Sequence, residues 1–437
     1  MNDNDLPKTL HPETLALHAG WRADLITGSV VPPIHQTTSY QFADSDQAAK
    51  RFSLQEAGPI YTRLGNPTID VLEQRLAALE GGVAAVAVSS GQAASAMAVQ
   101  TIAQAGDNIV SSTDIYGGTW NLFTHTLRNM GIDVRFVDPS DPQAFLKASD
   151  ERTRGWYLEM LPNPKLVVPP LAEIASLGRT HNIPLIVDNT AAPLIAKPLE
   201  HGAAIVIYST TKYIGGHGTS IGGIIIDSGT FDWDKTPKRH PLLTTPDPSY
   251  HGLIWSEAAK KFGPIAYALR LRAVLLRDLG AALSPFNAFQ LIQGVETLPL
   301  RMERHCENAA LIAHYLKRHK AVSKVIYPAL HKGETFKRAQ TYFNGRYGGL
   351  VGFELSNGVE GGKRFIDSLR LLYHVANIGD ARSLAIHPAS TTHSQLTPTE
   401  QKAAGVSPGY VRLSVGLEHP DDIIADLEQA LAQSQKA

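Results

Sequence analysis

The sequence predicts an α/β protein in which a mainly parallel, seven-stranded sheet is flanked by helices and followed by a smaller C-terminal α/β domain. Apolar, β-branched runs alternate with helical patterns over roughly 150 residues, which is typical of parallel sheets. The chain has 437 residues, more than one ordinary core accommodates. Several of the predicted strands end in polar residues, and the carboxyl ends of parallel strands are where such sheets bind ligands.

We predict three parts along the chain. Residues 1–60 are rich in Pro, Thr, Ser and Asp and lack long-range periodicity, so we expect an extended arm with one short helix from about Ser45 to Arg51. Residues 61–275 form the large domain and residues 276–437 the small domain. Because the arm cannot bury a core alone, we expect it to contact a neighbouring subunit.

The large domain begins with a helix that Asn66 starts and Gly81 stops. Tyr61 and Arg63 precede this helix. On a strand, residues at i and i+2 share a face, so a phenol and a guanidinium would lie together there. Such a pair suits a phosphate dianion, although an ordinary exposed pair has the same pattern.

The next strand, Val83 to Val88, breaks at a Ser-Ser-Gly-Gln turn and is followed by an Ala-rich helix from Ala93 to Ala103. The free amides and the positive dipole of a helix start bind anions, which places Ser90 and Gly91 at the mouth of an anion site. The turn is neither a Walker loop nor a GxGxxG motif. A phosphate on a non-nucleotide cofactor fits better.

The alternation then continues through six further strands, at Asn108–Ser112, Ile132–Val137, Gly155–Glu159, Pro184–Asp188, Ala203–Tyr208 and Gly223–Ile226, with helices at Trp120–Met130 and Leu171–Arg179. Asp188 closes one strand, where a carboxylate could keep a pyridine nitrogen protonated. Tyr116 follows another strand and could stack on an aromatic ring, and Asn163 ends a third and could donate to a ring oxygen. Each residue alone is more often a turn or cap residue, but together they suggest a cofactor.

Lys212 is the strongest candidate for a catalytic residue. The buried strand before it delivers Ser209, Thr211 and Lys212 to the carboxyl edge of the sheet. A lysine amine can form a Schiff base with a carbonyl cofactor, and neighbouring hydroxyls can donate to a phosphate. Pyridoxal phosphate (PLP) has both groups. The alternative is a surface lysine in a Gly-rich turn, which is the commoner origin of such a pattern in isolation.

The composition indicates small-molecule chemistry. The formal net charge of −1 gives no basic field for nucleic acid. No apolar run approaches the roughly 18 residues that a membrane helix needs, and the first residues do not form a targeting peptide. Cys306 is the only cysteine, which suits a reducing cytoplasm and excludes a Cys-based metal site. His387 and His393 lack an acidic partner, so we predict no metal.

Long, ordered motifs then identify a family. The segments IYTRLGNPT, SSGQAA, DIYGGT, VDNT and YSTTKYIGGHGTSIGG resemble the Cys/Met-metabolism family of PLP-dependent enzymes, of fold type I. Within this family, the segments PDPSYHGL (246–253), LSPFNAFQLIQGVETLPLRMERH (283–305) and HPASTTHSQL (387–396) resemble the O-acetylhomoserine sulfhydrylases. The resemblance extends from about Thr14 to the end of the chain.

The resemblance implies that Lys212 bonds to the cofactor aldehyde, that Asp188 pairs with the pyridinium and that Tyr116 stacks on the ring. It implies a phosphate site made by Ser90, Gly91, Gln92, Ser209 and Thr211. It also implies that Tyr61 and Arg63 reach the cofactor of a neighbouring subunit, so the protein would be a dimer, usually doubled to a tetramer. One departure is Met160 and Pro162, where we expect smaller residues; Asn163 is still in place.

Arg412 lies on a predicted strand between apolar neighbours, and a buried arginine needs an anion. The resemblance makes this anion the α-carboxylate of the substrate, bound bidentately with help from Ser383. The alternative is a structural salt bridge. Relatives that form or cleave cystathionine tend to carry Glu at the position of Arg382. Arg382 would repel the ammonium of cysteine, which favours hydrosulfide or methanethiol as the nucleophile.

The expected reaction is therefore γ-replacement, in which O-acetylhomoserine and sulfide or methanethiol give homocysteine or methionine and acetate. Lys212 would move the protons, with Tyr61 or Tyr116 as an assisting acid. Within the class, a methionine γ-lyase, an O-succinylhomoserine enzyme or a relative with another nucleophile would carry nearly the same residues. A non-catalytic assembly protein is disfavoured by intact Lys212, Asp188 and Arg412, and a nicotinamide dehydrogenase by the missing GxGxxG motif.

Overall fold

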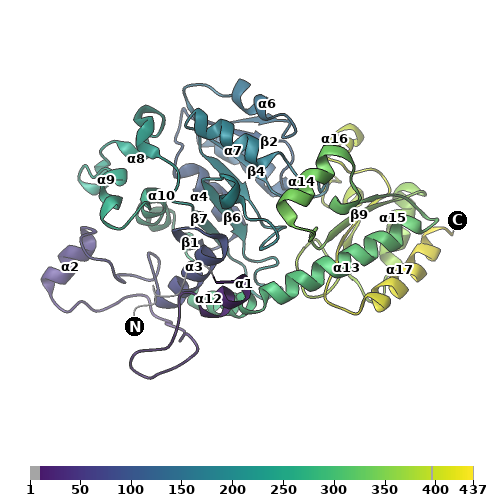
Figure 1. The fold of residues 1–437 in the computed structure, drawn as a ribbon, viewed down its shortest axis with the longest axis horizontal. Coiled ribbons are helices and arrows are strands. Elements are labelled where there is room, and N and C mark those ends of the chain that lie inside the picture. The colour runs from purple at the N-terminus through teal and green to yellow at the C-terminus, as the bar shows by residue number, and fades with distance from the viewer. Residues whose placement is uncertain (1–9, 395–396, 437) are drawn as a thin grey trace.

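Two β-sheets organise the chain in the computed structural model, which describes residues 10–394 and 397–436 (Figure 1). The larger sheet has seven strands in the order β1-β7-β6-β5-β4-β2-β3. Their bounds are β1 Ala84–Val88, β2 Asn108–Ser112, β3 Asp133–Val137, β4 Thr153–Glu159, β5 Leu185–Asp188, β6 Ile205–Ser209 and β7 Gly223–Asp227. Strand β7 pairs antiparallel with both of its neighbours, β1 and β6, and all other pairs in this sheet are parallel. The prediction of a mainly parallel, seven-stranded sheet is confirmed.

Helices cover both faces of this sheet because alternate residues of each strand point in opposite directions. Ala87 and Val206 pack with α3 (Pro67–Glu80), α7 (Leu171–Thr180) and α12 (Pro285–Glu296). Val86 and Ile207 face the other way and pack with α4 (Gly91–Gln100), α10 (Ala266–Arg270) and the π-helix that follows α10, at Leu271–Leu276. The centres of six strands are therefore buried, whereas the edge strand β3 is partly exposed along its length. The polar side chains at the strand ends are the groups available for chemistry.

The smaller sheet belongs to the C-terminal domain and has the order β10-β11-β12-β9-β8. Its bounds are β8 Val322–Ile326, β9 Leu350–Leu355, β10 Tyr373–His374, β11 Leu384–Ile386 and β12 Tyr410–Ser414. Helices α13 (Leu298–Arg318), α15 (Gly358–Ser368) and α17 (Pro420–Ser434) pack on it. Since α12 packs with the large domain and α13 runs from one domain into the other (Figure 1), we propose that the small domain begins within α13 rather than at residue 276.

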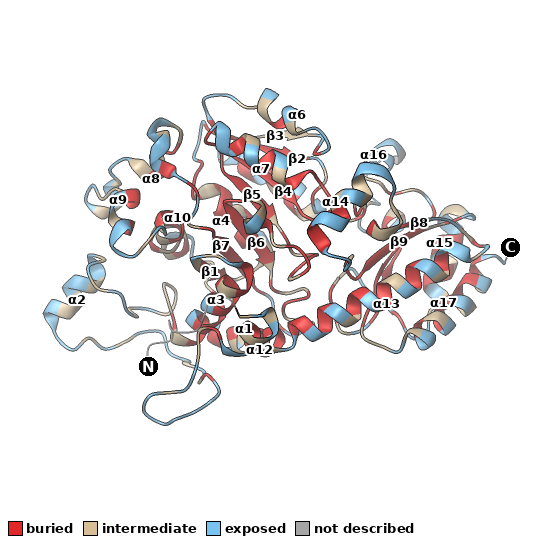
Figure 2. Cartoon of the chain, viewed as in Figure 1, coloured by how far each residue is buried: buried red, intermediate tan, exposed pale blue. Residues whose placement is uncertain are grey.

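The N-terminal arm departs from the prediction in one respect. The expected short helix is present as α2 (Ser45–Phe52), but a second helix, α1 (Pro12–His18), buries Ala16 in the large core cluster beside α3. With only seven residues, α1 is too short to show a helical period. The stretch between the two helices is exposed (Figure 2), and Leu25 and Ile26 keep 94% and 95% of their surface in solvent.

The remaining helices are short or peripheral. They are α5 (Gly117–Asn121), which continues as a π-helix at Leu122–Leu127, α6 (Pro142–Lys147), α8 (Pro241–Thr244), α9 (Trp255–Ala258), α11 (Arg277–Leu279), α14 (Gly333–Phe343) and α16 (Pro398–Ala403). Among the residues described, no helix is long and apolar enough to cross a membrane. The same part of the chain has no cluster of three side chains suited to hold a metal ion.

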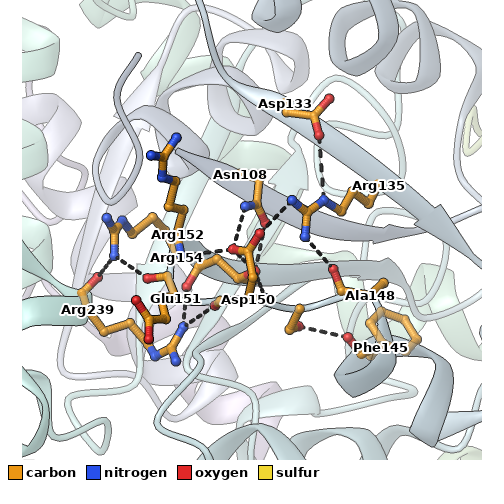
Figure 3. A network of polar contacts seen from close by, with 12 residues as sticks. Asn108, Asp133, Arg135, Phe145, Ala148, Asp150, Glu151, Arg152, Arg154 and Arg239 are labelled. Atoms are coloured by element: carbon orange, nitrogen blue, oxygen red, sulfur yellow. Dashed lines mark hydrogen bonds and ion pairs between the residues drawn. The ribbon is translucent and has the colours of Figure 1, made fainter. Parts of the chain in front are cut away.

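A charged network closes the amino-terminal edge of the large sheet (Figure 3). Asn108 and Arg135 both donate to the Asp150 carboxylate, at 2.9 and 2.6 Å, and these bonds hold the pKa of Asp150 well below its ordinary value. Arg154 pairs with Asp107 at 2.6 Å. Because β2 and β4 begin here, these charges lie at the edge opposite to the carboxyl ends and hold loops in place.

Glu80, at the end of α3, gives the stability a predictable pH dependence. It is 4% exposed, accepts a hydrogen bond from Tyr208 Oη, and its Oε1 atom has no partner. Burial raises its pKa from 4.5 to about 8. The folded protein then keeps a proton that the unfolded chain releases, so stability falls as the pH rises from about 4.5 through 8.

In wild type, Glu80 should make the unfolding free energy fall as the pH rises between about 6.5 and 8. We expect Glu80→Gln to make this slope shallower by up to about 1.4 kcal/mol per pH unit. Denaturant titrations at several pH values measure this slope. Between about pH 4 and 6.5, two buried histidines have the opposite effect and make stability rise with pH, because burial lowers the pKa of His240 and His305 from 6.5 to about 4. Glu257→Gln, at an exposed ion pair, is the control. Equal slopes in wild type and Glu80→Gln would contradict the prediction.

Candidate active site

The carboxyl ends of three adjacent strands form the floor of the candidate site. Glu159 of β4 is the register partner of Asp188 of β5, and β6 lies on the other side of β5. Asp188 Oδ1 accepts from the Thr190 amide at 2.9 Å, and Thr190 Oγ1 accepts from the Ser209 amide at 2.8 Å. Thr190 thus ties the ends of β5 and β6 together. Burial raises the pKa of Asp188, and the bonds from Thr190 oppose this rise.

The residues of the predicted anion site lie around the start of α4. Ser90 caps this helix by accepting from the Ala93 amide at 3.1 Å. A Cβ atom at Gly91 would lie 2.5 Å from Ser209 Cβ, so Gly91 lets the helix start approach the end of β6. Thr211 Oγ1 exchanges hydrogen bonds with the backbone of Gly222. The nearby Gln92 Oε1 accepts from Thr119 Oγ1 at 3.3 Å.

Tyr116 presents a half-exposed ring (56%) at the start of α5. Its amide donates to Glu159 Oε1 at 2.5 Å, which connects this turn to β4. A Cβ atom at Gly118 would lie 2.5 Å from the tyrosine ring, so the glycine is needed for this position of the ring. Asn163 brings a buried Oδ1 atom that has no hydrogen-bond partner. The open aromatic face fits an aromatic ring, and the unsatisfied Asn163 Oδ1 atom can accept a hydrogen bond from a polar group of a bound molecule.

Lys212 faces a residue of the small domain. Its Nζ atom donates to Asn377 Oδ1 at 2.5 Å, and the Asn377 carbonyl accepts from Arg412 Nη2 at 2.8 Å. Burial, and then the positive charge of Arg412, lower the pKa of Lys212. Sequence reasoning missed Asn377, because an asparagine in the loop between β10 and β11 looks like a turn residue until its position in the tertiary structure is known.

Arg412 lies on β12 and is 8% exposed. Its Nε atom is buried without a partner, and no carboxylate of the described chain pairs with its guanidinium. Burial lowers its pKa. A buried charge without an anion is costly, so a negatively charged group from outside the chain would be stabilised beside this guanidinium. The structural salt bridge considered above is absent from the described residues.

Two predicted substrate contacts are not supported by the structure. The amide and hydroxyl of Ser383 both donate to the Glu418 carboxylate, at 2.7 and 2.8 Å, so these donors are already used. Arg382 pairs with Asp380 at 2.8 Å and donates to the His217 carbonyl. Its charge is balanced within the chain, which removes the electrostatic argument that it would repel an ammonium group.

The segment with Tyr61 and Arg63 forms turns rather than the expected strand, apart from one isolated bridge between Tyr61 and Ser39. The two side chains are nevertheless close, with the guanidinium 5.4 Å from the ring centroid. Arg63 donates to the Arg277 carbonyl. Arg272 also holds this turn, because it donates to the Leu64 carbonyl at 2.8 Å.

Enzymes that use PLP need an amine for the aldehyde, a cradle for the phosphate and a carboxylate for the ring nitrogen. The strand ends described above offer all three groups. A match to the family model of Cys/Met metabolism PLP-dependent enzymes covers residues 13–432, and the chain belongs to this family.

The chain is 54% identical over 433 residues to an O-acetyl-L-homoserine sulfhydrylase of Leptospira meyeri, covering 98% of both chains. It is 51% identical to O-acetyl-L-homoserine sulfhydrylase 1 of Thermus thermophilus, over 96% of this chain and 99% of that one. Among solved structures it is similar to a putative O-acetylhomoserine (thiol)-lyase of Campylobacter jejuni that carries a pyridoxyl-lysine phosphate. That likeness has a TM-score of 0.93 and 42% identity, and covers 97% of this chain and 100% of that one.

Gly91→Ala tests the phosphate cradle. The added Cβ would collide with Ser209, and the helix start and the strand end would have to separate. We expect the dissociation constant of PLP to rise about tenfold or more, through the loss of one or two hydrogen bonds to a charged group. Absorbance titration of the cofactor-free protein measures it. Gly117→Ala, where a Cβ meets nothing within 4 Å, is the control. Unchanged affinity in Gly91→Ala would contradict the role of this cradle.

Proposed function

We propose that the protein catalyses γ-replacement on O-acetylhomoserine, with hydrosulfide or methanethiol as nucleophile, to give homocysteine or methionine and acetate. The observation that carries this proposal is the buried, unpaired guanidinium of Arg412, joined to the Lys212 amine through Asn377. An amino acid held by its carboxylate at Arg412 has its Cα near the lysine base. The names of the relatives supply the acetylated substrate.

The positions of the strand ends support the following cofactor contacts. Lys212 would bond to the aldehyde, Asp188 would face the ring nitrogen, Tyr116 would cover the ring and Asn163 would contact the ring oxygen. The phosphate would be held by Ser90, Gly91, Gln92, Ser209 and Thr211. PLP, when bound, supplies an electron sink for the negative charge left at a deprotonated Cα.

Lys212 is the proposed proton carrier. Its lowered pKa makes the neutral amine more available near neutral pH, as a base requires. The amine would take the proton from Cα and Tyr116 or Tyr61, as a tyrosinate, would take the proton from Cβ, while acetate would leave from Cγ and hydrosulfide would add at Cγ. The same amine would then return the protons, with Tyr116 or Tyr61 as an assisting acid. Arg412 would keep the carboxylate fixed throughout, so that Cα stays within reach of the amine.

We further propose a cytoplasmic homo-oligomer, a dimer with shared active sites that is doubled to a tetramer. Two observations support shared sites. Tyr61 and Arg63 lie together on a surface turn, and the stretch with Leu25 and Ile26 is too exposed for a segment that serves only its own chain. In this assembly the two side chains would contact the cofactor of the neighbouring subunit.

Product analysis of the purified protein tests the function. We expect homocysteine and acetate to form from O-acetylhomoserine only when sulfide is present. Ammonia and a keto acid formed without sulfide would show that water captures the intermediate and would replace the proposal by a γ-lyase. Competition between sulfide and methanethiol, and between acetyl and succinyl substrates, would establish the preferred nucleophile and leaving group. A protein that takes up no PLP would overturn the proposal.

A further inference from the structure

Two carboxyl groups share the floor of the site, although the proposed chemistry uses only one. Glu159 and Asp188 are register partners at the ends of β4 and β5. Neighbouring strands lie about 4.8 Å apart, and register partners point to the same face. Two carboxylates this close in a buried place disfavour each other's charge. One of them is therefore expected to hold a proton.

The surroundings assign this proton to Glu159. Glu159 is 8% exposed, and no basic side chain of the described residues pairs with it. Its acidic neighbour Asp114 is paired with Lys165 at 2.6 Å. Asp188 accepts from the Thr190 amide and lies 3.5 Å from the Tyr157 hydroxyl, and both contacts favour its charged form. At Glu159 the corresponding hydrogen bond comes, within the described chain, from the Tyr116 amide alone. Burial and then Asp188 raise the pKa of Glu159.

Glu159 also makes one contact that matters for the site. Its Oε1 atom accepts from the amide of Tyr116 at 2.5 Å. This amide stands at the first turn of α5, where Tyr116 itself offers no side-chain cap. The carboxyl group thus fixes the backbone that carries the half-exposed ring to the end of a neighbouring strand.

We propose that Glu159 is a positioning residue that acts as a neutral carboxylic acid. Its carbonyl oxygen holds the Tyr116 amide, and its proton leaves Asp188 as the single anion at the ring nitrogen of PLP. This inference rests on the proposed cofactor contacts and adds a residue to which they give no role. A neutral acid is chemically close to an amide, since both offer one acceptor oxygen and at least one donor.

Two substitutions test separately whether the length of the Glu159 side chain or its ability to ionise matters. Glu159→Gln keeps the reach to Tyr116 and removes the ionisable group, so we expect the PLP dissociation constant to stay within about twofold of wild type. Glu159→Asp keeps a carboxyl group but is one methylene too short to hold the amide, so we expect an increase of about fivefold to tenfold. Glu360→Gln, at an exposed ion pair, is the control. Absorbance titration of the cofactor-free proteins gives these constants.

Infrared difference spectra give an independent measurement of the protonation state. Wild type minus Glu159→Gln should contain the carbonyl stretch of a protonated carboxyl group at neutral pH. Its absence, or a glutamine variant that binds PLP as weakly as the aspartate variant, would overturn the proposal. Neither measurement needs turnover, so a failure here is distinct from a failure of the sulfhydrylase reaction.

Discussion

Lys212→Ala is expected to lower kcat for homocysteine formation at least about 1,000-fold, because in the proposed mechanism one amine provides both the bond to PLP and the proton transfers. The same variant should lose the visible absorbance of lysine-bound PLP. Both losses follow from the position of the amine at the end of β6, where burial and Arg412 lower its pKa. Initial rates of homocysteine formation with saturating substrates measure the effect.

Lys197→Ala is a matched control, since this lysine pairs with Glu200 at 3.3 Å outside the site. The control should keep its activity and its spectrum. The thermal stability of Lys212→Ala should be no lower than that of the control, because the variant removes a desolvated amine. Activity within tenfold of wild type would show that another group moves the protons.

The parts of the fold that sequence reasoning predicted correctly are those that depend on local pattern. The seven strands of the large sheet were found because each is a short, apolar run between turns, and all seven lie within a few residues of their predicted bounds. The strand ends could then be located, since the carboxyl ends of parallel strands lie at the same edge of the sheet. Asp188, Ser209 and Lys212 reach the site for this reason.

What the sequence missed depends on contacts between distant segments. Asn377 reaches Lys212 only because the small domain folds back on the large sheet, with 165 positions between the two residues. Arg382 was assigned an unpaired charge, but it forms an ion pair with Asp380. The sequence does not reveal this pair, because either side chain could instead face solvent. Ser383 was expected to help bind the substrate carboxylate, yet both its donors are taken by Glu418, four residues beyond the end of β12.

We expect Arg412→Met to weaken substrate binding without lowering the stability of the protein. Removing the guanidinium should raise KM for O-acetylhomoserine about 30-fold or more, since loss of one partner of a buried charge pair costs about 2–5 kcal/mol. The unfolding free energy of the substrate-free protein should stay equal or rise, because methionine replaces a buried charge that has no anion in the described chain. Steady-state kinetics and denaturant titration measure the two effects.

Arg301→Met is the matched control, because Arg301 is also buried but its donors are satisfied. Arg301 donates to the carbonyls of Tyr213, Ile214 and Gly294 at 2.6, 3.1 and 2.6 Å. Its loss removes these three hydrogen bonds, and within the described residues only the Gly294 carbonyl keeps another, from Thr297 Oγ1 at 3.4 Å. An unsatisfied buried acceptor costs about 1–3 kcal/mol, so this variant should be destabilised. Arg412→Met with the same destabilisation and an unchanged KM would make Arg412 a structural residue. If the unfolding free energy falls in Arg301→Met but not in Arg412→Met, Arg301 stabilises the fold, whereas Arg412 serves substrate binding.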